Sequence, residues 1–304
     1  MRLTRLQNNS LKKIASISSV SLASILCCAK AAAFFYTDSL AILSSLVDSL
    51  SDIFASLITF FAIKISVKPA STSFRYGYGK IESLSALFQA GFVAASGLFI
   101  LYDTILRLKN PVPITQTTFG LIVMLISLVS TIALVSFQRF VAKRTKSQAI
   151  MADSLHYYVD ILTNSSIIIS LITTSFLGVN WIDSFVAGAI ALYLLYNAYD
   201  LGKDAVNILM DKELSDEIRQ SVYAAVSKHP ISPKIHDLRT RDLGCGYIFE
   251  FHIEFDGKLS LSTTHRYTEE VENLIRQKYP SAQIIIHQDP IGIKENRLDR
   301  QLSG

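Results

Sequence analysis

The chain has 304 residues, of which 50% are hydrophobic and 18% are charged, and its mean hydropathy is +0.35. This composition excludes an ordinary soluble globular protein, which is less apolar and more highly charged. The formal net charge of +4 is modest, and the basic residues stand beside the apolar runs. We therefore interpret them as signals of membrane topology rather than as a nucleic-acid-binding surface, and we expect no nucleic-acid partner.

Six apolar runs occupy the first two thirds of the chain, and each is near the roughly 20 residues that a transmembrane helix needs. The first run follows basic residues, as in a signal peptide, but five more runs follow it, so we predict that it is retained. The predicted spans are residues 13–36, 40–66, 81–106, 115–139, 148–176 and 180–202. Lys and Arg are concentrated in the N-terminal tail and in the second and fourth connections, which predicts that both termini are cytoplasmic.

From Asp211 onward the chain has the composition of a globular domain. Residues 247–256 alternate between apolar side chains and Glu250, His252 and Glu254, which predicts a strand with one buried and one polar face. The predicted elements follow the order helix, strand, strand, helix, strand: 215–229, 234–243, 247–256, 261–279 and 282–289. The sequence therefore predicts a membrane α-helical bundle followed by a small α+β domain. We place their boundaries at residues 1–209 and 210–291, with a disordered tail over residues 292–304.

The second span contains Asp48 and Asp52 within SSLVDSLSD, four residues apart and therefore on one face of a helix. An ionised carboxylate in hydrocarbon costs roughly 2.5–3.5 kcal/mol on insertion scales, and two neighbouring like charges repel each other. A cation between the two carboxylates removes both penalties. This stretch therefore predicts a cation site inside the bilayer.

The fifth span repeats the pattern in MADSLHYYVD, where His156 and Asp160 are also four residues apart. Asp153 lies one turn earlier, and two interpretations stay open for it: a ligand on the path of the metal into the site, or a solvated residue at the cytoplasmic end. At 1.5 Å per residue, both pairs lie about 14 and 20 Å from the end at which their helix enters a core of roughly 30 Å. Polar contacts between helices are the alternative, but two pairs at one depth favour a tetrahedral site for Zn, Fe(II) or a similar divalent ion.

The combination of SLVDSLSDI and ADSLHYYVD resembles the paired DxxxD and HxxxD signature of the cation diffusion facilitators, most closely their bacterial iron/zinc efflux branch. The similarity continues through GYGKIESLSAL, IHDLRTR and IIIHQDP, and so covers nearly the whole chain. It implies six-helix protomers that pair into homodimers in a bacterial inner membrane, each with a cytoplasmic metallochaperone-like domain. A divalent metal is exchanged for protons in that family by alternating access.

The resemblance also implies residues in the C-terminal domain that bind metal. The family has a binuclear site on the dimer-facing surface, and the positions that match its ligands are His236, His252, His265, His287 and Asp289. Lys80 and Asp211 match a charge pair that joins the transmembrane part to the tail and the dimer. Between the second and third spans the chain departs from the branch: Ser71, Phe74 and Tyr78 stand where ligands are expected, so we predict no metal there.

The implied function is efflux of a divalent metal by metal/proton antiport. Metal and protons compete for the same side chains because metal ligands must be deprotonated, and His156 is the natural titrating group because imidazole titrates near neutral pH. We expect zinc as substrate and regulator, with iron(II) and cadmium as alternatives. An enzyme is not expected, because no HExxH or similar motif occurs. A membrane sensor or scaffold that binds metal without transport is the alternative function.

Overall fold

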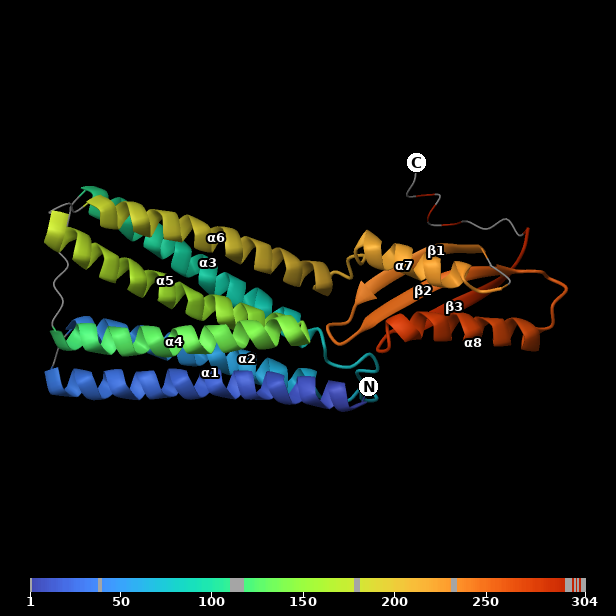
Figure 1. Ribbon diagram of the computed structural model, residues 1–304, viewed down its shortest axis with the longest axis horizontal. Coiled ribbons are helices and arrows are strands. Elements are labelled where there is room, and N and C mark those ends of the chain that lie inside the picture. Colours follow the sequence, from blue (N-terminus) through green and yellow to red (C-terminus); the bar gives the residue numbers. More distant parts are fainter. Residues whose placement is uncertain are drawn as a thin grey trace. The chain divides into compact units, whose positions relative to one another are not determined.

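The computed structural model describes residues 2–37, 40–109, 118–177, 181–230 and 234–292, together with Arg297, Asp299 and Gln301. The chain divides into two compact units. Figure 1 shows that one consists of long helices and the other contains a small sheet with its own helices. The first unit comprises Arg2–Lys68 and Ile81–Val206, and the second comprises Pro69–Lys80 and Asn207–Gly304.

The first unit is built from long helices that confirm the six predicted from the apolar runs. They are α1 (Arg2–Thr37), α2 (Leu40–Ser66), α3 (Ile81–Lys109), α4 (Thr118–Thr145), α5 (Gln148–Leu177) and α6 (Trp181–Leu209). Several extend beyond the predicted spans, α1 at its start and α4 at its end. The hydrophobic core of a bilayer limits only the apolar part of a helix, and the backbone hydrogen bonds continue past it.

Five of these helices, α5 excepted, hold a stretch in the described residues that is long and apolar enough to cross a membrane. The first half of α5 carries Asp153, His156 and Asp160. Ionisable residues are costly at membrane depth and mark functional positions there.

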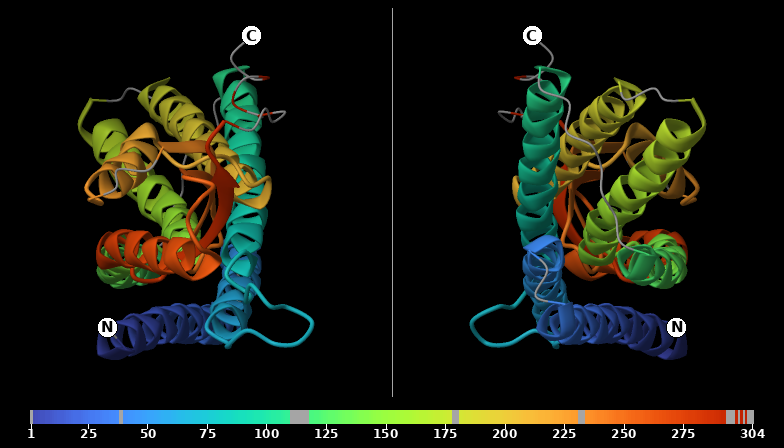
Figure 2. Two further views of the ribbon diagram at one scale, coloured as in Figure 1. Left: turned by 90° about the vertical axis from the view of Figure 1, so that its right-hand side faces the viewer. Right: turned by 90° about the vertical axis from the view of Figure 1, so that its left-hand side faces the viewer.

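Small side chains allow the helices of the bundle to pack closely. α1 packs along α2 and α4, and α5 packs against α3 and α4. Ala15, Ala62, Ala142 and Ala149, from α1, α2, α4 and α5, are buried in one cluster. The end-on views in Figure 2 show that the helices are inclined to one another. Helices in lipid associate mainly through close van der Waals packing, which small residues favour.

The second unit confirms the predicted order of helices and strands. Its elements are α7 (Asp216–Ser227), β1 (Lys234–Asp242), β2 (Tyr247–Phe255), α8 (Leu261–Lys278) and β3 (Gln283–Pro290). The sheet has the order β1-β2-β3, in which β1 is antiparallel and β3 parallel to β2. A parallel neighbour requires a crossover connection, which α8 supplies. Most of the predicted disordered tail, 292–304, lies outside the described residues.

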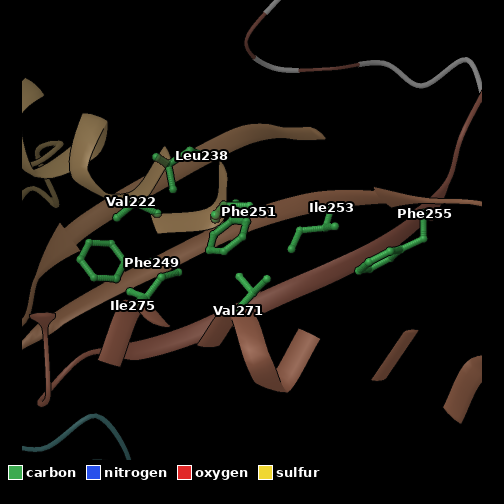
Figure 3. Close-up of a cluster of buried hydrophobic side chains, with 9 residues drawn as sticks. Val222, Leu238, Phe249, Phe251, Ile253, Phe255, Val271 and Ile275 are labelled. Atoms are coloured by element: carbon green, nitrogen blue, oxygen red, sulfur yellow. The ribbon is translucent and has the colours of Figure 1, made fainter. Parts of the chain in front are cut away.

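Strand β2 supplies the centre of the core of this domain, as Figure 3 shows. Its alternate residues Phe249, Phe251 and Ile253 are fully buried and pack with Val222 of α7 and Val271 of α8. Burying one such side chain contributes roughly 1.5–3 kcal/mol. The core therefore fixes which face of the sheet the helices cover, and the polar residues between these positions lie on the other face.

Candidate metal sites

Helices α2 and α5 bring a carboxylate and an imidazole together inside the bundle. The Oδ1 atom of Asp52 lies 3.1 Å from Nε2 of His156, and these side chains are only 15% and 12% exposed. Two ligands of a tetrahedral zinc ion, each at about 2.0–2.1 Å from it, lie about 3.3 Å apart. The pair therefore has nearly the spacing of two neighbouring metal ligands.

The other two predicted ligands lie one turn away on the same helices. Asp160 is partly buried and interacts electrostatically with Asp52 and His156, whereas Asp48 is exposed in the single chain. The four do not form a closed cluster: among the described residues, three potential ligands lie within 4.8 Å of one another only in the C-terminal domain, at His236, His252 and Asp289. Three carboxylates of like charge repel one another, which favours an open arrangement.

Asp153 is fully buried, so the interpretation of this residue as solvated is wrong. Its Oδ2 atom accepts hydrogen bonds from Ser19 Oγ and Gln138 Nε2, both at 2.6 Å. Ser19 also shares a hydrogen bond of 2.8 Å with Ser56, which shares one of 2.6 Å with Tyr157. This polar network joins α1, α2, α4 and α5. Ser19 therefore links α1 to polar side chains of α2 and α5.

Lys30 of α1 belongs to the same region, and sequence reasoning missed it. Its Nζ atom donates a hydrogen bond of 2.7 Å to Ser49 Oγ, and Ser49 is a buried residue that follows Asp48. The ammonium also interacts electrostatically with Asp48 and Asp160. The signal was present in the sequence, because an ionisable residue within an apolar span marks a functional position by default.

The C-terminal domain holds a tight group of potential ligands that comes from the register of the sheet. His236 pairs with His252 across β1 and β2, and His252 pairs with His287 across β2 and β3. Asp289 Oδ2 lies 2.7 Å from His252 Nδ1 and 3.5 Å from His236 Nε2. Its Oδ1 lies 3.1 Å from His287 Nε2. Imidazoles and a carboxylate at these distances suit zinc or iron(II).

Two further residues support this group from one side. Nδ1 of His236 lies 3.4 Å from Glu254 Oε1, and Arg297 forms an ion pair with the same oxygen. A histidine that binds a metal through one nitrogen commonly directs the other toward a carboxylate, and Glu254 takes that place. His265 is not brought into the group. It is 67% exposed on α8, with Nε2 3.5 Å from Oε1 of Glu269.

The predicted charge pair is also formed, within the second unit. Lys80 Nζ lies 2.7 Å from Asp211 Oδ1, and both side chains are about one third exposed, at 34% and 39%. Arg241 Nη1 lies 3.5 Å from the other carboxylate oxygen of Asp211. In the loop Pro69–Lys80, Ser71 and Tyr78 share a hydrogen bond of 2.9 Å. Phe74 donates its backbone N–H to Ser71 Oγ at 3.1 Å and its ring lies 4.8 Å from that of Tyr78, so the three residues that replace family ligands contact one another.

A membrane bundle with ionisable residues at its centre, followed by a domain with a histidine and carboxylate group, defines a membrane protein that handles metal cations. The chain belongs to the cation efflux family, whose members are the cation diffusion facilitators. Residues 16–210 match the cation efflux transmembrane domain, and residues 214–291 match the cytoplasmic domain of cation efflux proteins. The prediction of the family is therefore confirmed, together with cation efflux as the function.

Relatives identified by sequence agree with this assignment. The chain is 40% identical over 279 residues to the cation-efflux pump FieF of Shigella flexneri serotype 5b. The aligned residues cover 92% of this chain and 93% of that protein. The same values hold for FieF of Escherichia coli O1:K1. Among solved structures, the metal-bound C-terminal domain of the CzcD transporter from Thermotoga maritima is 26% identical, with a TM-score of 0.25, and covers 26% of this chain and 93% of that one. The putative zinc transporter CzrB is 30% identical, also with a TM-score of 0.25, and covers 26% and 99%.

Proposed function

We propose that this protein exports a divalent metal ion in exchange for protons, and that Asp48, Asp52, His156 and Asp160 form its transport site. The observation that carries the proposal is the 3.1 Å approach of Asp52 to His156, between two helices of the bundle. The sequence predicts both residues near the middle of the membrane. Asp48 and Asp160, one turn away on the same two helices, complete the proposed ligand set.

Proton coupling follows from the chemistry of these four side chains. Carboxylates and imidazole bind a metal ion only when they are deprotonated. In the state open to the cytoplasm, the metal displaces protons from the site. In the state open to the outside, protons return to the ligands and release the metal. His156 is the natural proton acceptor, because imidazole changes charge near neutral pH.

The C-terminal group provides a second metal site, with a regulatory role. His236, His252, His287 and Asp289 supply the donors within one chain. His265 is exposed, so it is accessible to a second copy of the chain in a homodimer. Metal binding at this site holds the two C-terminal domains together and biases the transport cycle. Lys80 and Asp211 fix the connection between the second and third helices to this domain.

The arrangement in the membrane follows from the distribution of Lys and Arg, which places both termini in the cytoplasm of a bacterial cell with the bundle in the inner membrane. Residues 1–209 form the transmembrane domain and residues 210–291 the metal-binding domain. Zinc is the proposed substrate and regulator, and iron(II) and cadmium suit the same oxygen and imidazole donors. The protein carries out transport and no chemical conversion.

Flux into proteoliposomes under an imposed pH gradient tests this function. We expect zinc transport by the natural protein, and none by the double variant D52A/H156A, which removes two ligands of one site. The variant D200A, which removes an exposed carboxylate of α6, serves as the matched control and should transport zinc. Transport by D52A/H156A would show that the site is wrong. Zinc binding without flux in the natural protein would favour a sensor or scaffold.

A further inference from the structure

The transport region contains a fixed cation in addition to its acidic ligands. Lys30 lies on α1, and its ammonium donates a hydrogen bond of 2.7 Å to Ser49 Oγ. Ser49 is 1% exposed and lies between the two predicted ligands of α2, Asp48 and Asp52. The ammonium is therefore held against the backbone turn of α2 that carries half of the proposed site.

The charges around Lys30 are those of the proposed ligands on both helices. It interacts electrostatically with Asp48 of α2 and with Asp160 of α5. An ammonium at membrane depth is costly unless it has a counter-charge, and these carboxylates provide one. A cluster of carboxylates is likewise costly when it holds no cation. Lys30 and the acidic residues thus compensate each other in the metal-free protein.

We propose that Lys30 is the built-in counter-ion of the transport site. Its ammonium balances part of the acidic charge while the metal-free carrier returns to the state open to the cytoplasm. When a divalent ion binds, the ammonium is repelled from the ligands. Lys30 therefore lowers the affinity for metal and assists the return of the metal-free carrier. The inference rests on the proposed transport site.

This role makes two effects of Lys30 run in opposite directions. A fixed positive charge close to the ligands repels a divalent ion, so removal of the charge strengthens metal binding. The metal-free carrier then has less positive charge beside those carboxylates that protons leave ionised, so its return becomes slower. A residue that only supported the fold would change binding and transport in the same unfavourable direction.

Three measurements on the full-length protein test the proposal: the zinc dissociation constant, net zinc transport, and exchange of radioactive zinc at equal zinc concentrations on both sides. Net transport requires the metal-free carrier to return, whereas exchange does not. For K30M we expect about tenfold tighter zinc binding, the effect of removing one partly screened like charge. We also expect the ratio of net transport to exchange to fall by about tenfold.

Matched variants separate charge from structure. K30R keeps the positive charge and should have the same ratio of net transport to exchange as the natural protein. S49A removes the hydrogen bond to Lys30 and should change this ratio by less than about threefold. K13M makes the same substitution at an exposed lysine of α1 and should behave like the natural protein. Weaker zinc binding by K30M, or an equal loss of net transport and exchange, would overturn the proposal.

The outcomes for Lys30 and for the transport site remain distinct. If D52A/H156A transports zinc in the otherwise natural chain, the proposed site itself fails. If that double variant is inactive and K30M has the natural affinity and ratio, only the role of Lys30 is wrong. Gel filtration of each variant in detergent identifies any that do not fold. If K30M does not fold, the ratio of net transport to exchange in K30R tests the role of Lys30.

Discussion

Lys12 and Glu82 form a buried ion pair, with 2.6 Å between Nζ and Oε1. Their side chains are 11% and 4% exposed. The same carboxylate accepts hydrogen bonds from Ser66 Oγ, at 2.8 Å, and from Ser147 Oγ. The side chain of Glu82, near the start of α3, therefore holds three other parts of the bundle together. These are the first part of α1, the end of α2 and the residue before α5.

Substitution of one member of this pair should destabilise the bundle strongly. E82A leaves the ammonium of Lys12 buried without its counter-ion, and breaking a buried pair in this way costs about 3–5 kcal/mol. We expect a clear fall in the unfolding temperature of the protein in detergent. The double variant K12M/E82M should be less affected, because it leaves no unpaired charge. K13M, at an exposed neighbour, is the control, and an equal loss in E82A and K12M/E82M would contradict the argument.

The charge pair of Lys80 and Asp211 should contribute much less. It is about one third exposed, and pairs of this kind contribute about 0–1 kcal/mol. D211A should cost more than K80A, because Asp211 also contacts Arg241 at 3.5 Å. Denaturation of the full-length protein at low and high salt measures both effects. The difference in unfolding free energy between each variant and the natural protein should become smaller as salt rises. A loss of stability in K80A as large as that in E82A would show that this ranking is wrong.

Within the C-terminal group, Asp289 should matter most for metal binding. It contacts His236, His252 and His287 within 3.5 Å, so D289A should weaken zinc binding by at least about tenfold. The measurement is a zinc titration of the full-length protein in the D52A/H156A background, which removes the contribution of the transport site. H265A is the comparison. If it weakens binding as much as D289A, a second copy must supply His265 to the site.

Gly79 should tolerate no side chain. A Cβ atom there would lie 2.2 Å from the carbonyl oxygen of Leu243 and 2.8 Å from the backbone nitrogen of Cys245. Because both contacts are backbone atoms, G79A must move the loop away from the turn between β1 and β2, at a cost of about 1–3 kcal/mol. Hydrogen exchange over Pro69–Lys80 should become faster. G91A, where nothing lies within 4 Å, is the control, and unchanged exchange in G79A would refute the prediction.

Local patterns predicted much of this protein because they act over a few residues. The period of 3.6 in α2 and α5 placed Asp48 with Asp52 and His156 with Asp160, and the period of 2 in β2 separated its apolar core from His252. The lengths of the apolar runs predicted six helices. In each case the physical cause, exclusion of polar groups from hydrocarbon or from a core, operates within one helix or strand.

Contacts between distant residues could not be predicted in this way. The sequence predicts only a topology signal for Lys12, as one of the basic residues of the N-terminal tail. Its buried ion-pair partner, Glu82, is 70 residues away. Asp153 had two open interpretations until its burial and its bonds to Ser19 and Gln138 excluded the solvated one. Nothing local indicates which polar residue on one helix meets which on another, because this depends on how the helices are rotated and packed.

The sequence by itself determined that this chain is a membrane protein with two acidic helix faces and a histidine-containing soluble domain. Tertiary structure decided which of these residues meet. It brought Asp52 to His156 and left Asp48 exposed, and it set Lys30 beside Ser49. It also aligned His236, His252 and His287 across three strands. The reason is that hydrophobic periodicity specifies the inward face of an element, whereas register and helix rotation are fixed only when the elements pack together.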